Sequence, residues 1–183
     1  MASRPNRLYW DTGVFIEFFT NDPDSPYLPA IKELHARAKR GEFQICTSVI
    51  SISEAAFVAP AEFENGVFVG GHEDELDEMW ADYPAILCVN LDPHIALQAR
   101  AMKRWAITKG VGKVDPDDLL HLATALFLKV GAVQTLDKKW FPYTEFLQRS
   151  VGYPEAAASG PPSLLPEGAP VQRLGSGETD EDG

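Results

Sequence analysis

From residue 115 the chain reads Asp115-Pro-Asp-Asp-Leu-Leu-His-Leu-Ala-Thr-Ala-Leu126, an acidic start followed by an apolar run. Pro116 suits the first turn of a helix, where its missing N–H has no partner, and Asp115 before it is suited to cap exposed amides. Leucines and alanines then recur at helical spacing, which predicts an amphipathic helix. Asp118 and His121 fall on a neighbouring stripe, so we expect Asp118 to point along the buried face. So many acids at one helix start suggest a cation site.

The same acids also have a simpler explanation. Negative side chains in a first helical turn are stabilised by the helix dipole, so capping and dipole effects account for Asp115 and Asp117 taken singly. A functional interpretation of Asp118 therefore needs support from other parts of the chain.

The length of 183 residues favours a single domain with a substantial core. We assign residues 1–150 to this domain and residues 151–183 to an acidic, Pro- and Gly-rich tail, which we expect to be disordered because it has little apolar periodicity. No run approaches the ~20 apolar residues that cross a bilayer. Cys46 and Cys88 lie far apart in apolar runs, as reduced core cysteines do. We therefore expect a cytoplasmic protein that does not enter a membrane.

The net charge of −11 argues against a protein that coats nucleic acid through a uniformly basic surface. The acid is concentrated in the tail and in the run Glu73–Glu78, so local basic patches remain. One patch, called here the basic stripe, lies on a predicted helix that starts at Pro93, and two more lysines follow a later strand. The residues are Arg100, Lys103, Arg104 and Lys109 in the stripe, and Lys138 and Lys139 beyond it. The ordinary explanation is a solvated helix face; the alternative is contact with phosphates.

Short apolar runs at residues 8–10, 43–47, 86–89 and 132–135 predict strands, and amphipathic helical patterns lie between them. This alternation predicts an α/β fold with a mainly parallel central sheet covered by helices. The stretch 59–72, rich in Gly and Pro, is interpreted as a loop or short hairpin.

Three acids outside the organising helix stand at predicted element ends. Asp11 and Asp137 each follow a strand, and Glu54 falls in the first turn of a helix that we expect to open at Ser51. Simple alternatives exist, because Asp11 suits an Asx turn and the spacing of Ser51 and Glu54 suits a capping box. In a parallel sheet, however, all these positions and Asp118 share one edge, where ligands bind.

Carboxylates that converge at one edge repel one another unless a cation lies between them. Oxygen ligands without a nearby cysteine favour Mg²⁺ or Mn²⁺ over zinc. Metals held in this way suit phosphodiester hydrolysis, in which they activate water and stabilise the leaving oxygen.

Four segments of the chain together resemble the PIN-domain family of metal-dependent ribonucleases, which includes VapC-like toxins of bacterial toxin–antitoxin pairs. They are Tyr9-Trp-Asp-Thr-Gly-Val-Phe-Ile16, Thr47-Ser-Val-Ile-Ser-Ile-Ser-Glu54, Asp118-Leu-Leu-His-Leu-Ala-Thr-Ala-Leu126 and Thr135-Leu-Asp-Lys-Lys-Trp-Phe141. The resemblance spans roughly residues 6–147. It implies a three-layer α/β/α fold, an RNA substrate and an antitoxin-like protein partner.

Carried over position by position, the resemblance implies that four acids form the catalytic metal site: Asp11, Glu54, Asp118 and Asp137. It makes the hydroxyl of Thr12 or Thr135 a supporting group, with Asp115 and Asp117 as cap and auxiliary charge. Together with Met79 and Trp80, interpreted as exposed apolar residues on an acidic helix, it also suggests a homodimer.

Two features depart from the family pattern: Gly13 stands where many relatives carry a polar side chain, and segment 59–82 is elaborate for a compact toxin. Two other classes of protein stay open at this point. One is a PIN-like module that binds RNA or protein with little catalysis. The other is a receiver-like signalling domain, which also binds Mg²⁺ at the acidic edge of a parallel sheet. Asp11 stands alone after the first strand, whereas a receiver is expected to carry paired acids there.

Overall fold

The main sheet of the protein, a computed structural model, has five parallel strands in the order β5-β2-β1-β6-β7. The structure describes residues 6–55, 62–64, 67–69, 73–82, 85–112 and 114–155. The strands are β1 Arg7–Trp10, β2 Gln44–Ser48, β5 Ile86–Val89, β6 Ala132–Gln134 and β7 Ser150–Gly152. A separate antiparallel pair is formed by β3 Glu62–Glu64 and β4 Val67–Val69, so the hairpin alternative is confirmed for these two strands, and the other residues of 59–72 lie outside the described part.

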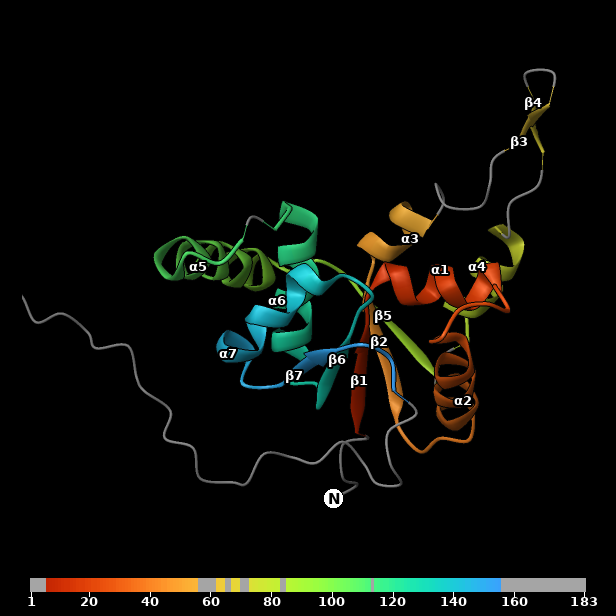
Figure 1. Ribbon diagram of the computed structural model, residues 1–183, viewed down its shortest axis with the longest axis horizontal. Helices are drawn as coiled ribbons and strands as arrows, with labels where there is room; N and C mark the ends of the chain where they lie inside the picture. Colours follow the sequence, from red (N-terminus) through yellow and green to blue (C-terminus); the bar gives the residue numbers. More distant parts are fainter. Residues whose placement is uncertain are drawn as a thin grey trace, which may run out of the picture.

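Helices cover both faces of the sheet, which gives the expected three-layer α/β/α fold (Figure 1). On one face lie α5 Pro93–Lys109, α6 Pro116–Leu128, the 3₁₀ helix η1 Lys138–Tyr143 and α7 Thr144–Leu147. On the other lie α1 Thr12–Thr20, α2 Leu28–Lys39 and α4 Glu73–Trp80. The short α3 Ile50–Ala55 follows β2 at the carboxyl edge.

Successive side chains along each strand point to opposite faces of the sheet, and this alternation creates the two apolar cores between the layers. In β1, Leu8 and Trp10 pack toward α1 and α2, whereas Tyr9 between them packs toward α5 and α6. Tyr9 and Trp10 are completely buried, as expected where strands of a parallel sheet are covered on both faces. The central strand β1 thus packs against both helical layers. Asp11 follows this strand directly, so its backbone is held in place by the same packing.

The organising helix forms as predicted. Asp115 has extended backbone geometry (φ −70°, ψ 157°) and its carbonyl accepts the first helical hydrogen bond from Leu119 N–H at 3.1 Å. Asp118 Oδ2 accepts the Asp115 backbone N–H at 3.3 Å, so the acid in the first turn steadies the cap residue. The helix ends where Lys129 adopts a left-handed conformation.

Two sequence-based expectations need correction. Met79 is 7% exposed and belongs to the core between the sheet and α1, and the ring of Trp80 packs on Phe15 with centroids 4.8 Å apart. These side chains are therefore not exposed, and their support for a homodimer is lost. The domain boundary after residue 150 cuts β7, whose Val151 is buried. Residues 156–183 lie outside the described part of the chain, so disorder of the tail stays a prediction.

The sheet order also decides between fold classes. Counted along the main sheet alone, the strands run 3-2-1-4-5, whereas receiver domains run 2-1-3-4-5. The receiver-like alternative is therefore wrong. The order reverses between β1 and β6, and ligands of open α/β sheets bind at such a reversal, outside the carboxyl ends of the strands. Within the described residues, no helix combines the length and apolarity needed to span a membrane.

Candidate active site

Asp11 stands at the reversal point of the sheet, directly after β1. Its backbone N–H donates to Gln134 O of neighbouring β6 at 3.2 Å, which holds the two strand ends together. Its side chain also caps α1, because Oδ1 accepts Val14 N–H at 3.0 Å, while Oδ2 accepts the Thr135 hydroxyl. The cap interpretation of Asp11 is thus confirmed, and its role in a metal site stays a prediction.

Glu54 reaches the same edge from α3. The helix begins at Ile50, so Ser51 lies inside its first turn, and the predicted capping box is wrong. The Ser51 hydroxyl contacts Thr47 Oγ1 at 2.7 Å instead, and Glu54 Oε2 accepts the hydroxyl of Thr12. The carboxylate is free to turn toward α1 because it is not needed at the start of its own helix.

Asp118 in α6 and Asp137, the cap residue of η1 after β6, complete the group. Asp137 Oδ1 accepts Lys139 N–H at 2.9 Å, and the Asp137 N–H donates to Thr135 Oγ1 at 3.0 Å. Thr135 therefore contacts both Asp11 and Asp137, and it supports the two acids on either side of the reversal point.

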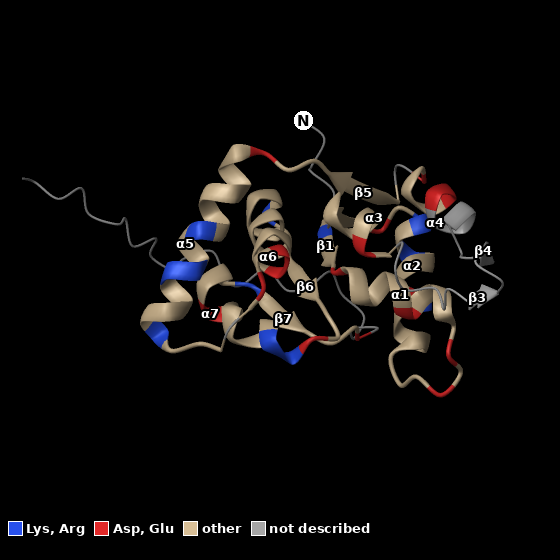
Figure 2. Cartoon of the chain, turned by 90° about the horizontal axis from the view of Figure 1, so that it is seen from above, with Lys and Arg blue, Asp and Glu red and all other residues tan. Residues whose placement is uncertain are grey.

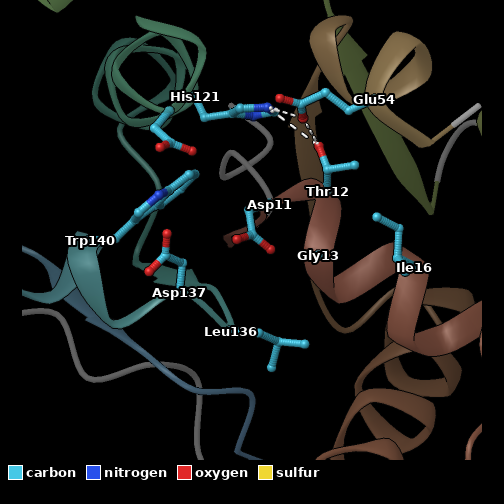
Figure 3. A pocket seen from close by; sticks show the side chains of 10 residues that line it. Asp11, Thr12, Gly13, Ile16, Glu54, His121, Leu136, Asp137 and Trp140 are labelled. Atoms are coloured by element: carbon cyan, nitrogen blue, oxygen red, sulfur yellow. Dashed lines mark hydrogen bonds and ion pairs between the residues drawn. The ribbon is translucent and has the colours of Figure 1, made fainter. Parts of the chain in front are cut away.

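These residues line one open pocket with a volume of about 560 Å³ (Figure 3). Its lining consists of Asp11, Thr12, Gly13, Ile16, Glu54, Asp118, His121, Leu136, Asp137 and Trp140. The pocket thus contains all four acids that the sequence singled out, although they come from four separate segments. A Cβ at Gly13 would lie 3.4 Å from Asp11 Oδ1, which is an ordinary van der Waals distance, so the backbone passes close to this carboxylate.

The donor chemistry of the pocket fits a hard divalent cation, since the ionisable oxygens are carboxylates and neither cysteine lines it. Within the part of the chain that the structure describes, however, no three His, Cys, Asp or Glu side chains are already placed as one ligand set.

The pKa values of the acids in the pocket shift in different directions. Burial raises the pKa of Asp11 to about 6, helped by the charge of Asp118 and opposed by the hydrogen bond from Thr135. Burial also raises the pKa of Asp118, with the charge of Asp137 acting in the same direction. For Glu54, partial burial raises the pKa, but hydrogen bonds from His121 and Thr12 outweigh it and the net shift is downward. A positive charge in the pocket would lower the raised pKa values of Asp11 and Asp118.

The remaining predicted residues lie outside the pocket. Asp115 and Asp117 are exposed and do not line it. The basic stripe is exposed along the outer face of α5 (Figure 2), where Lys109 pairs with Glu145 at 2.8 Å. Lys138 and Lys139 are exposed directly after Asp137, at the rim.

His121 is the functional candidate that sequence reasoning passed over. It is 1% exposed, and its Nε2 lies 3.0 Å from Glu54 Oε2 while its Nδ1 lies 2.8 Å from the Tyr9 hydroxyl. The spacing of Asp118 and His121, three residues apart on a helix, is the sequence signal that places both side chains on one face.

Comparison with known proteins identifies relatives by fold and by family. No curated protein matches the chain. Solved structures with a similar fold include VapBC2 from Rickettsia felis bound to a promoter DNA fragment, at 14% identity and TM-score 0.54, covering 80% of this chain and 98% of that one. FitAcB from Neisseria gonorrhoeae is 18% identical with TM-score 0.53 and coverages of 80% and 97%. DNA-bound VapBC from Salmonella typhimurium is 17% identical with TM-score 0.51 and coverages of 80% and 96%.

At these identities the solved structures establish the fold. The family follows from a sequence model described as PIN domain, which matches residues 8–147. This range includes the described helices, all four acids of the pocket and every strand of the main sheet except β7 and the first residue of β1. The chain belongs to the PIN domain family.

Proposed function

We propose that the protein is a divalent-metal-dependent endoribonuclease. The observation that carries this proposal is the convergence of four carboxylates, from four segments of a PIN domain, on one open pocket at the reversal point of the sheet. They are Asp11, Glu54, Asp118 and Asp137, and they would hold Mg²⁺ or Mn²⁺. When bound, the cation supplies activation of water and stabilisation of the leaving oxygen.

The chain itself supplies position and shape. Thr135 fixes Asp11 and Asp137 relative to each other, and Thr12 fixes Glu54. The apolar sides of Ile16, Leu136 and Trp140 form the rest of the wall, which gives a nucleotide an uncharged surface beside the acids. The pocket is open, so a strand of RNA can pass across it.

A catalytically weak module that binds RNA or protein is the second candidate, favoured by the lack of a ready-made ligand set among the described residues. Incubation of the purified chain with single-stranded RNA and with DNA of the same sequence, each with Mg²⁺ or Mn²⁺, separates the two functions. The nuclease cleaves RNA internally, whereas the module retains RNA or a protein partner without shortening the RNA.

We infer that the basic stripe on α5, with Lys138 and Lys139, contacts phosphates that an acidic pocket cannot hold by itself. Neutralising Lys103 and Arg104 is expected to lower the slope of log affinity against log salt by up to ~1.4, because each single-strand phosphate contact contributes ~0.7. Affinity is measured with an Asp118→Asn background to prevent cleavage.

The matched control for this prediction neutralises Lys32 and Lys39 of α2, on the opposite face of the sheet. This double substitution removes the same net charge from the protein. An equal slope change in both double variants would show a general charge effect and would contradict phosphate binding by the stripe.

A toxin-like nuclease needs restraint, and we propose that a separate antitoxin-like protein supplies it. The similar folds of the two VapBC structures support this partner. The alternative is the acidic tail acting as a mimic of phosphates. Removal of residues 155–183 is expected to leave the cleavage rate and the Mn²⁺ affinity within twofold of the full chain, a difference of at most ~0.4 kcal/mol in free energy. A several-fold rise at low salt that vanishes at high salt would instead identify the tail as the inhibitor.

A further inference from the structure

We propose that Tyr9 and His121 form a positioning relay that holds Glu54 in the pocket through a hydrogen bond from His121 Nε2. This inference rests on the proposed function, and it adds two positioning residues that act through the carboxylate. Figure 3 shows the imidazole of His121 and the carboxylate of Glu54 facing each other across the top of the pocket.

The direction of each hydrogen bond follows from the donors and acceptors. An ionised carboxylate only accepts, so at 3.0 Å from Glu54 Oε2 the proton must sit on His121 Nε2. In the neutral ring, Nδ1 is then the acceptor, and the Tyr9 hydroxyl at 2.8 Å is its donor. Tyr9 thereby selects the imidazole tautomer that can hold Glu54.

Neighbouring aromatic rings also hold the plane of the His121 imidazole. The Tyr9 ring meets the His121 ring edge-on, with centroids 6.0 Å apart and a 74° angle, and Trp140 lies on another side at 5.8 Å and 38°. His121 and Trp140 are both at most 2% exposed, so the surrounding side chains restrict the rotation of both rings. A locked imidazole gives the Glu54 carboxylate one orientation instead of several.

That orientation leaves one oxygen available. Glu54 Oε2 accepts both Thr12 Oγ1–H and His121 Nε2–H, whereas Oε1 has no hydrogen-bond partner among the described residues. The relay therefore presents Glu54 to a cation through a single oxygen. It also ties the short α3 to α6, one turn beyond Asp118, so that two acids of the pocket depend on one helix.

Three substitutions in the full chain test the relay. Tyr9→Phe removes only the hydroxyl, His121→Leu removes both hydrogen bonds at similar volume, and His121→Gln keeps an amide N–H able to reach Glu54. Thr124→Val is the matched control, since the buried Thr124 hydroxyl lies on the same helix and, among the described residues, donates only to Leu120 O, at 2.8 Å.

Two readouts do not depend on cleavage: calorimetric titration with Mn²⁺, and nitrogen–proton correlation spectra of the imidazole in the metal-free protein. We expect wild-type His121 to carry its proton on Nε2. We expect His121→Leu to bind Mn²⁺ about 10- to 100-fold more weakly, as other changes behind metal ligands do. Tyr9→Phe should lose tautomer selection and about tenfold in affinity, with His121→Gln close to wild type and Thr124→Val unchanged.

A folded His121→Leu with wild-type Mn²⁺ affinity, a His121→Gln as defective as His121→Leu, or a wild-type ring with its proton on Nδ1 and none on Nε2 would each overturn the relay. If His121→Leu does not fold, Tyr9→Phe decides by the same two readouts. A wild-type protein that binds no Mn²⁺ and cleaves no RNA contradicts the proposed function itself, and the spectra then still report separately whether the hydrogen bonds exist.

Discussion

Asp118→Asn is expected to lower RNA cleavage by at least about 100-fold while the domain stays folded. Even substitutions behind metal ligands cost 10- to 100-fold, and this change removes a carboxylate charge that lines the pocket itself. Asparagine preserves the size of the side chain and one oxygen, so the hydrogen bond from the Asp115 N–H can persist. Cleavage of labelled RNA at saturating Mg²⁺ measures the effect.

The control for this prediction is Asp117→Asn. It makes the same change in charge and size one residue earlier in the same helical turn, but Asp117 is exposed and does not line the pocket. We expect Asp117→Asn to cleave like the wild type. Equal losses in the two variants would mean that the helix start matters only through its general charge.

Asp11 is expected to make the metal-free protein less stable as the pH rises from about 4 to about 6. Its pKa is about 6 in the folded protein against an ordinary 3.8, so the unfolded chain loses this proton first and gains stability relative to the folded state. A shift of this size corresponds to about 3 kcal/mol at pH 7. Asp11→Asn should therefore be more stable than wild type at pH 7, by an amount that vanishes below pH 4.

Urea unfolding of both proteins in the presence of a chelator measures this difference across the pH range. Subtracting one protein from the other removes the contributions of acids that both share. Added Mn²⁺ should stabilise only the wild type strongly, because the ion binds the charged form of Asp11. A difference in unfolding free energy that is the same at pH 4 and pH 7 would contradict the pKa of Asp11.

The meeting of the four acids was predictable because it depends on local signals and one topological rule. Asp11 and Asp137 follow apolar runs that predict strands, and strand ends in a parallel sheet share an edge. The capping pattern at Asp115 and Pro116 placed Asp118 in a first helical turn. None of these inferences required knowledge of how distant side chains pack.

The errors arose where distant packing decides the outcome. Glu54 was compatible with a local capping box, but its partners are Thr12 and His121, which are 42 and 67 residues away in the chain. Trp80 lies in an acidic helix, yet Phe15 of α1 covers its ring. The short edge strand β7 has only three residues, too few to show a period beside the proline-rich tail.

Metal-dependent cleavage by the wild-type chain tests the proposed four-carboxylate site most directly. The protein is stripped with a chelator, incubated with single-stranded RNA, and assayed again after addition of Mg²⁺ or Mn²⁺. We predict no cleavage by the stripped protein, recovery with either ion, and no recovery in Asp118→Asn. Cleavage by the stripped wild type at the rate of the metal-loaded protein would contradict the proposed site.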